Sequence, residues 1–353
     1  MQSKEELISI FMGKGIDQDT ASTWAYYLQQ LPTCSLHSAD IQVANEEAWL
    51  AARTHGIGGS DIASILGESS WKSAYDIWMS KTGQLPSPST GAEHLQSEPA
   101  RWGNLLEDTI AYEWARRNNK QIIKIPVSLK SDEHPYMLAN IDGFVLSDDR
   151  KTITGILEIK TTSAYNKELW ETGPVPYYYI CQATWYTMIT NLPGFDIVCL
   201  VGGQHLFSYY FPKDPELCER MKAAADKFWN VNVKQLVAPD FQAVDAQRVT
   251  EAEISDDCAD KPTIDNSDKT DNAIQAYLEL NEKIRALESI KKELYAKIFQ
   301  AMHSKPTMVT RSNTVKLSRS TRRTCDFDTL QHDFPEAYDA TVTAKASSRL
   351  VIS

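Results

Sequence analysis

The spacing of hydrophobic residues changes along the chain and divides it into helical and β-rich parts. Near the N-terminus, EELISIFM and DTASTWAYYLQQL place hydrophobic residues at helical spacing. The segment 102–118 repeats that spacing, with one hydrophobic stripe formed by Leu105, Leu106, Ile110 and Trp114. The period then shortens in QIIKIPVSL, YMLANIDGFVL and TITGILEIK, which are separated by the turn-forming segments SDEHP and SDDRK. These patterns predict helices up to about residue 118 and strands after it.

Helices and strands alternate again beyond this β-rich part. A helix is predicted from about Val175, in PYYYICQATWYTMITN, and another is predicted over 214–234. Between them, FDIVCLVG and HLFSYYF have the pattern of strands. Helices that alternate with β-runs in this way pack on the faces of a sheet. The predicted fold class is therefore α/β, or α+β, with a central mixed β-sheet flanked by helices.

The C-terminal part of the chain differs in composition. Residues 240–270 are rich in acids, and 271–303 have the pattern of one long charged helix. Hydrophobic residues in this helix alternate at spacings of three and four, with an interruption at Lys291. Two interpretations stay open: the helix packs on its own domain or in a hairpin, or it forms a coiled coil with another chain. A basic, β-like tail follows.

The same patterns predict the domain organisation. Residues 1–50 are expected to form a helical preface without chemistry, followed by the core domain over 51–239. An acidic linker over 240–270 then leads to the C-terminal region 271–353, which holds a long helix or helical hairpin and the basic tail. Chemistry is therefore expected in the core domain.

Composition excludes several classes of protein. Of the 353 residues, 42% are hydrophobic, which is ordinary for a globular protein. No run of about 18 apolar residues occurs, and the N-terminus is too polar for a secretory signal, so we expect no membrane span and no secretion. The six cysteines form no C-x-x-C pair, which argues against a zinc ribbon, an iron–sulfur clamp or a disulfide framework. We expect a cytoplasmic protein with reduced thiols.

Charge is distributed unevenly along the chain. A net charge of -11 by itself disfavours a plain nucleic-acid binder, because phosphate contacts need Lys and Arg. Residues 305–323, however, hold six basic residues and no acid. The overall charge is therefore a poor guide to the partners of this protein.

The residues with the clearest chemical meaning lie between 140 and 160. Asp142 follows a strand-like run, and Glu158 and Lys160 are two residues apart in the apolar run ILEIK. Residues two apart on a strand face the same side, so a carboxylate and an ammonium are expected to point together. Such a set suits a hard divalent cation such as Mg²⁺, with Lys160 orienting water or stabilising charge on a phosphate. The alternative is an exposed strand with an ordinary ion pair.

Two features on predicted helices favour a functional site over an ordinary ion pair. Glu107 ends the motif GNLLE on the helix before the strands, where it could complete a metal site or be a solvated acid near a helix start. Gln182 and Tyr186 are four residues apart on the helix after ILEIK and share one of its faces. They could hold a phosphate or a base of a nucleic-acid substrate.

The order of these motifs resembles a known family. Arg53 and Ser60 form R-x6-S, ending in GIGGSD, and GNLLE, ANIDG, LEIKTTS and Q-x-x-x-Y follow. Together they resemble the YqaJ-type viral recombinases, a family similar to the lambda-type exonucleases within the PD-(D/E)XK nuclease superfamily. The resemblance spans about Arg53 to Phe211, and the tail ending SSRL is also similar to the extension of longer members. The superfamily's proline is absent, since Ile141 precedes Asp142.

The resemblance implies a restriction-endonuclease-like core that digests linear double-stranded DNA from the 5′ end. The 3′ overhang left behind would serve a single-strand annealing recombinase. It implies Asp142, Glu158, Lys160 and Gln182 as the catalytic set. It implies one or two Mg²⁺ or Mn²⁺ ions per site, held by Glu107, Asp142, Glu158 and the main-chain carbonyl of Ile159. Contacts to the substrate would come from Arg53, Ser60, Asn140 and Tyr186, of which Arg53 and Ser60 match residues that hold the 5′-phosphate.

Several alternatives stay open at this point. Ser60 or Asp61 could instead be the N-cap of a helix after the GIGG turn. The chain could be a non-catalytic module that binds DNA ends or another protein, or a DNA endonuclease of the same superfamily. By analogy with relatives, we expect a homo-oligomer, a trimeric ring around DNA, encoded by a phage or prophage and acting in the cytoplasm of the bacterial host.

Overall fold

The computed structural model describes residues 2–38, 55–84, 98–245, 267–318 and 325–342. The chain divides into two compact units, Met1–Ala246 and Gln247–Ser353, and each is described by itself. Arg53, most of the predicted linker and the SSRL tail lie outside the described residues. The predicted domain boundaries therefore stay predictions.

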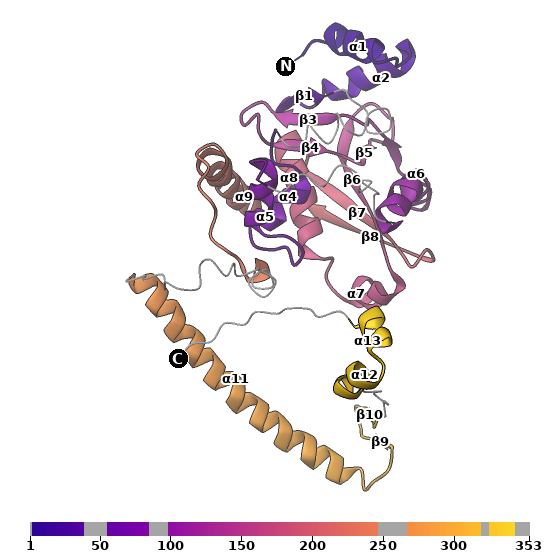
Figure 1. The fold of residues 1–353 in the computed structure, drawn as a ribbon. Coiled ribbons are helices and arrows are strands. Elements are labelled where there is room, and N and C mark those ends of the chain that lie inside the picture. The colour runs from indigo at the N-terminus through magenta and orange to yellow at the C-terminus, as the bar shows by residue number, and fades with distance from the viewer. Residues whose placement is uncertain (1, 39–54, 85–97, 246–266, 319–324, 343–353) are drawn as a thin grey trace. The chain divides into compact units, whose positions relative to one another are not determined.

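The centre of the first unit is a five-stranded mixed sheet in the order β2-β5-β6-β7-β8 (Figure 1). Only β6 and β7 of this described sheet run parallel; its other neighbours are antiparallel. The strands are β2 Gln121–Ile123, β5 Gly143–Leu146, β6 Ile153–Thr162, β7 Gly194–Val201 and β8 His205–Pro212. The predicted central mixed sheet is thereby confirmed.

Helices cover both faces of this sheet because its strands alternate two sets of apolar side chains. Leu157 and Ile159 of β6 pack with helix α6 (Glu98–Asn118) on one face, where Ile110 and Trp114 are buried. Ile156 belongs to the core on the other face, which includes helix α8 (Tyr177–Thr190). The connection from β6 to the parallel strand β7 runs through η1 (Ala164–Asn166), α7 (Lys167–Thr172) and α8.

The stripe predicted for α6 is correct except at one residue. Ile110 and Trp114 are buried and Leu106 is partly buried against the same cluster. Leu105, in contrast, is 60% exposed, so its inclusion in the stripe was wrong. The sheet contacts a narrow strip of the helix, and Leu105 lies about 100° around the helix from Leu106, beyond the reach of the sheet.

A second, three-stranded antiparallel sheet lies beside the first in the order β1-β3-β4. Its strands are β1 Cys34–Ser38, β3 Ser128–Ser131 and β4 Leu138–Asn140. The prediction of only helices over 1–50, and of one sheet for all the strands, was therefore wrong. Cys34 pairs with Ser131, far away in the sequence, so β1 depends on a tertiary partner that its own short sequence does not reveal.

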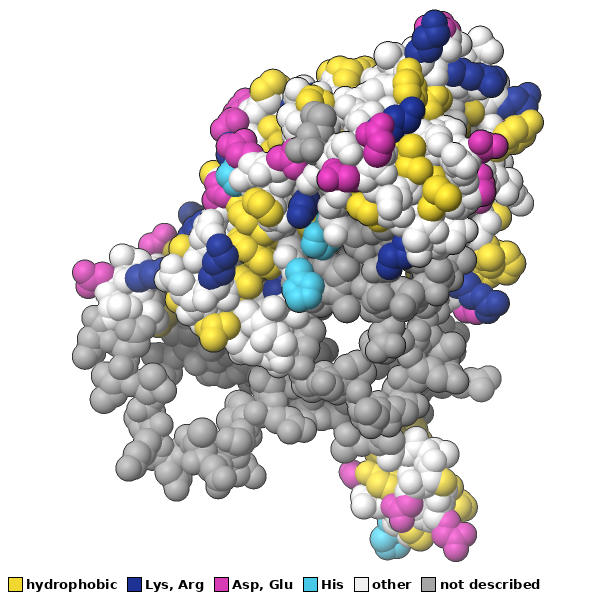
Figure 2. All heavy atoms as spheres, turned by 90° about the horizontal axis from the view of Figure 1, so that it is seen from above, with side chains coloured by type: hydrophobic (Ala, Val, Ile, Leu, Met, Phe, Trp, Pro, Cys, Tyr) yellow, Lys and Arg dark blue, Asp and Glu magenta, His cyan; other side chains and the backbone are white. Residues whose placement is uncertain are grey.

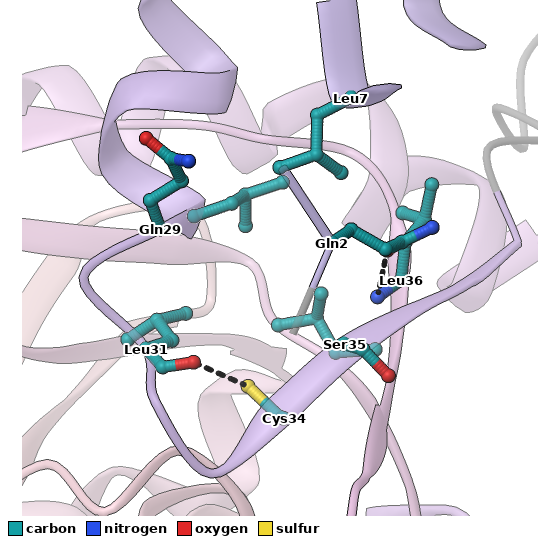
Figure 3. Close-up of a pocket in the computed structure, with 9 residues that line it drawn as sticks. Gln2, Leu7, Gln29, Leu31, Cys34, Ser35 and Leu36 are labelled. Carbon is teal, nitrogen blue, oxygen red and sulfur yellow. Dashed lines mark hydrogen bonds between the residues drawn. The ribbon is translucent and has the colours of Figure 1, made fainter. Parts of the chain in front are cut away.

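The predicted N-terminal helices are present as α1 (Lys4–Gly13) and α2 (Gln18–Leu28). Ser3 caps α1 in a capping box with Glu6, and Asp17 caps α2. Between these helices and β1 lies a cavity of about 20 Å³ (Figure 3), where the Leu36 N–H donates to Gln2 Oε1 at 3.1 Å. This space is too small for anything larger than a water molecule, so it is a packing gap.

Shorter helices complete the first unit. They are α4 (Gly59–Ile65), α5 (Ala74–Lys81), α9 (Pro215–Lys227), the π-helical turn η2 (Phe228–Val233) and the 3₁₀ turn η3 (Ala243–Asp245). Figure 2 shows basic and acidic side chains interspersed with hydrophobic ones over the described part of one face. This is the mixture of an ordinary protein surface.

The second unit consists mainly of the helix α11 (Asp268–Ala301), whose N-cap is Ser267. A hairpin of β9 (Thr307–Val309) and β10 (Thr314–Lys316) and two short helices, α12 (Phe327–Asp333) and α13 (Pro335–Thr341), follow it. No residue of α11 is buried. Among the residues described in either unit, no helix combines the length and the apolar character needed to cross a membrane.

Candidate active site

The central strand β6 carries two charged residues side by side. Glu158 is 0% exposed, and its Oε1 lies 2.5 Å from the Nζ of Lys160, which is itself mostly buried. The ion pair confirms that residues two apart on this strand share a face. The ammonium of Lys160 also lies 5.1 Å from the ring centre of Tyr179 on α8. Carboxylate and aromatic face together fix the position of the ammonium.

Asp142 is held against the same strand from the segment between β4 and β5. Its Oδ2 accepts a hydrogen bond of 2.8 Å from the backbone N–H of Ile159. Ile159 lies between Glu158 and Lys160 in β6. This hydrogen bond therefore holds the Asp142 carboxylate next to the part of β6 that carries Glu158 and Lys160. The fold therefore brings together Asp142 and Glu158, which are 16 residues apart in the sequence.

Glu107 reaches the site from α6, with a partner that the sequence did not reveal. Lys124, just beyond β2, lies 2.5 Å from Glu107 Oε1 and also forms an ion pair with Asp108. Gly103 lies where α6 meets β6, and a Cβ there would be 3.3 Å from Thr161 Oγ1, a contact tighter than ordinary packing. Lys124 follows the strand run QII, but no motif marks it, because its role depends on a helix that packs across the sheet.

These residues open into one cavity of about 420 Å³ at the edge where β6 meets α6. Its lining is formed by Pro99, Ala100, Gly103, Asn104, Glu107, Asp142, Ile159, Lys160 and Thr161. Four of the predicted site residues therefore share a cavity large enough for a nucleotide-sized group. Glu158 lies beneath it, joined to it through Lys160.

The carboxylates raise one another's pKa. Burial, together with the nearby Glu158 charge, raises the pKa of Asp142 to about 7. Burial also raises the pKa of Glu158, and burial and the Asp142 charge raise that of Glu107. For Lys160, burial acts to lower the pKa, but the Glu158 and Asp142 carboxylates outweigh it and raise the pKa. The cluster is thus an acidic site short of positive charge.

The donor atoms suit a hard divalent cation. Within the described residues, no three His, Cys, Asp or Glu side chains form a ready metal site as they stand. Lys124 and Lys160 hold one oxygen each of Glu107 and Glu158, while the other oxygen of Glu158, Oε2, is buried with no hydrogen-bond partner among these residues. Carboxylate and carbonyl oxygens are the ligands that Mg²⁺ and Mn²⁺ prefer, so the residues fit such an ion.

Gln182 and Tyr186 form a hydrogen-bonded pair on α8. The Nε2 of Gln182 donates to the Tyr186 hydroxyl at 3.2 Å. Tyr186 is buried, and its ring lies against Gly59, where an added Cβ would be 2.5 Å from Cε1. A glycine is therefore needed at the start of α4. Tyr186 thus packs between Gln182 and α4 with 3% of its surface exposed, and its predicted contact with a substrate stays a prediction.

The remaining predicted contacts lie along α4 and β4. Ser60 is an exposed residue in the first turn of α4. The N-cap is Gly58, whose N–H donates to Asp61 Oδ2 at 3.0 Å, so the alternative prediction of Ser60 or Asp61 as N-cap was wrong. Asp61 is instead the third residue of the helix, and its side chain accepts a hydrogen bond from the backbone N–H of the N-cap residue. On β4, the Oδ1 of Asn140 is buried without a hydrogen-bond partner among the described residues.

The raised pKa of Asp142 predicts how stability depends on pH in metal-free protein. The folded state binds this proton more tightly than the unfolded chain, whose carboxyl has a pKa of 3.8, so stability should fall as the pH rises from about 4 to about 7. Asp142→Asn should flatten this part of the curve, as measured by urea unfolding in EDTA across that range. Asp148→Asn, in an exposed turn, is the matched control and should keep the wild-type slope. An unchanged slope in Asp142→Asn would contradict the assignment.

Comparison with known proteins agrees with the motifs. Residues 48–193 match the YqaJ-like viral recombinase domain. The protein YqaJ of Bacillus subtilis (strain 168) is 34% identical over 264 residues, which cover 73% of this chain and 78% of that protein. Among solved structures, the alkaline exonuclease LHK-Exo of Laribacter hongkongensis aligns with a TM-score of 0.45 and 17% identity, over 54% of this chain and 94% of that one. LHK-Exo in complex with dAMP gives 0.43 and 16% over the same shares. On the strength of its sequence relative, the chain belongs to the YqaJ family of viral recombinase domains.

Proposed function

We propose that this protein is a metal-dependent 5′-to-3′ exonuclease that digests linear double-stranded DNA and leaves 3′ overhangs for recombination. One observation carries the proposal: α6, β6 and the segment before β5 bring Glu107, Asp142 and Lys160 to one cavity, with Glu158 buried beneath. Carboxylates of raised pKa next to an ammonium held in place are typical of the active site of a metal-assisted phosphodiesterase. The recombinase description of the family supports the biological setting.

In this proposal the metal would be held by Glu107, Asp142, Glu158 and the main-chain carbonyl of Ile159. A bound Mg²⁺ or Mn²⁺, one or two per site, supplies Lewis-acid charge at the scissile phosphate and lowers the pKa of a water molecule. Lys160, fixed by Glu158 and the Tyr179 ring, donates hydrogen bonds to the oxygens on which negative charge develops. Gln182 orients groups beside Lys160 and is itself held by Tyr186.

The polarity of digestion would come from contacts to the end of the DNA. Arg53 and Ser60 hold the terminal 5′-phosphate, and Asn140, with its unsatisfied buried oxygen, lies on the strand leading to Asp142. Two backbone hydrogen bonds join Ile57, just before α4, to the segment that enters β4. The Ile57 N–H donates to the Tyr136 carbonyl at 2.7 Å, and the Ile57 carbonyl accepts from the Leu138 N–H at 2.9 Å. Action in the bacterial cytoplasm, with a single-strand annealing partner and as a trimeric ring, is part of the same proposal.

End-labelled linear duplex and a covalently closed plasmid test the activity together. The exonuclease should digest the linear duplex from its 5′ ends only when a divalent ion is added, and should leave the closed circle intact. Nicking of the circle would identify an endonuclease instead. A complex with linear DNA that never shortens the strand would identify a non-catalytic end-binding module.

Arg53→Ala should selectively weaken the preference for 5′-phosphorylated over 5′-hydroxyl ends. One charge-assisted hydrogen bond to a phosphate corresponds to a loss of about tenfold in that preference. The measurement is the initial digestion rate of the two linear substrates by each variant. Lys151→Ala, an exposed turn residue, is the control. An equal loss of digestion rate on 5′-phosphorylated and 5′-hydroxyl ends would refute the proposal that Arg53 binds the 5′-phosphate.

A further inference from the structure

The helix α11 presents an apolar seam, interrupted once by Lys291, that nothing in its own unit covers among the described residues. The seam consists of Tyr277, Leu280, Ile284, Leu287, Leu294 and Ile298, at alternating spacings of three and four once Lys291 is included. Each of the six apolar side chains is 45 to 65% exposed. A stripe of this period along a helix of 34 residues, about 51 Å, is what a partner helix buries in a coiled coil.

The charge pattern of α11 is complementary to itself in one orientation. Residues 268–282 carry four acids and one Lys, for a net charge of -3. Residues 283–301 carry five bases and two acids, for a net charge of +3. A second α11 running antiparallel would place the acidic half of each helix on the basic half of the other. A parallel partner would place like charges together.

The position of Lys291 agrees with the antiparallel orientation. If Ile284 of one helix lies opposite the partner's Leu287, the seam residues continue in register over nearly the whole of α11. Tyr277 then faces the partner's Leu294, and Lys291 faces the partner's Leu280, which has Glu279 and Glu282 close by in the sequence. In a parallel pair, Lys291 would face its own copy across the core, which is unfavourable unless both chains extend to solvent.

We propose that α11 pairs with α11 of a second copy of this chain as an antiparallel two-stranded coiled coil. Two strands leave the core open at its sides, so Lys291 can extend its ammonium to solvent and to the acidic half of the partner. The pairing requires no nuclease activity, so it stands or falls independently of the proposed function. Its role is to join two protein copies, and hence two DNA ends if each copy holds one.

Seam variants of the full chain test the pairing by light scattering coupled to size exclusion. Leu287→Asp buries a charge at the centre of the seam and should weaken pairing by at least about 100-fold, which halves the mass at micromolar concentration. If the first units associate further, the mass should fall to that of the assembly that they hold together without α11. Leu278→Asp is the matched control, because Leu278 is 39% exposed on the same helix but off the seam, and it should keep the wild-type mass. Equal masses for wild type and Leu287→Asp would overturn the proposal.

Cysteine crosslinking tests the orientation, with Cys258 and Cys325 replaced by Ser. Tyr277→Cys and Leu294→Cys are prepared as separate proteins, so that each can be oxidised alone or in a mixture. The antiparallel pair predicts a disulfide-linked dimer in the mixture and little in either protein alone. Efficient crosslinking of Tyr277→Cys by itself would show a parallel pair, and no crosslinking in any sample would show that the helices do not meet; either outcome overturns the proposal.

Discussion

Asp142→Asn should reduce digestion of linear duplex DNA by at least about a thousandfold, because it removes a charge that both holds the metal and neutralises it in the site. The fold should survive this change, since an Asn side-chain oxygen can still accept the hydrogen bond that Ile159 N–H now donates to Asp142. Removing one of three mutually repelling carboxylates should leave the metal-free protein at least as stable as the wild type. Single-turnover digestion of end-labelled duplex, alongside thermal unfolding, measures both effects.

The control for this experiment is Asp148→Asn, an exposed turn residue of the same chemistry. Digestion by Asp142→Asn within a few-fold of the wild-type rate would remove Asp142 from the site. Lys160→Ala should abolish digestion as well, but it leaves the fully buried Glu158 without its ammonium. Such an uncompensated buried charge costs about 3–5 kcal/mol, so loss of activity there would mix chemistry with unfolding. The isosteric change at Asp142 avoids this ambiguity.

Trp185→Ala should lower the free energy of unfolding by about 3–5 kcal/mol, the largest effect on stability that we expect from a single change. Trp185 is fully buried on α8, one residue before Tyr186. Its indole N–H donates to the Leu138 carbonyl of β4 at 2.9 Å, so it links the helix behind the central sheet to the second sheet. Removing the ring leaves a cavity at this junction and an unpaired carbonyl. Urea unfolding monitored by circular dichroism measures the change.

Trp71→Ala provides the matched control for Trp185. Trp71 is 76% exposed, so its loss should change the free energy of unfolding by no more than about 0.5 kcal/mol. Trp185→Phe separates packing from the hydrogen bond, because it keeps most of the volume while leaving the Leu138 carbonyl without its donor, at a cost of about 1–3 kcal/mol. If Trp185→Ala and Trp71→Ala cost the same, α8 is not fixed through this side chain.

The sequence predicted those features that depend on local backbone geometry. The change of period from helical to alternating correctly located α6, the strands of the mixed sheet and α8. The spacing of Glu158 and Lys160 predicted a shared face, because every strand alternates its side chains. The order of five weak motifs was enough to indicate the family, since it reflects the order in which the fold supplies its parts. These features need no knowledge of which segments come into contact.

The features that the sequence could not give depend on contacts between distant segments. The strand β1 forms because β3 offers its edge, and Lys124 enters the site because α6 brings Glu107 and Asp108 to it. Tyr186 is buried because Gly59 of α4 lies against its ring, which a pattern of Gln and Tyr four residues apart does not reveal. Local periodicity fixes which way a side chain points from its own element, whereas packing across the chain decides what it meets. For that reason the sequence determined most of the elements and the candidate chemistry, whereas the tertiary structure decided that β1 forms and which charges share the cavity.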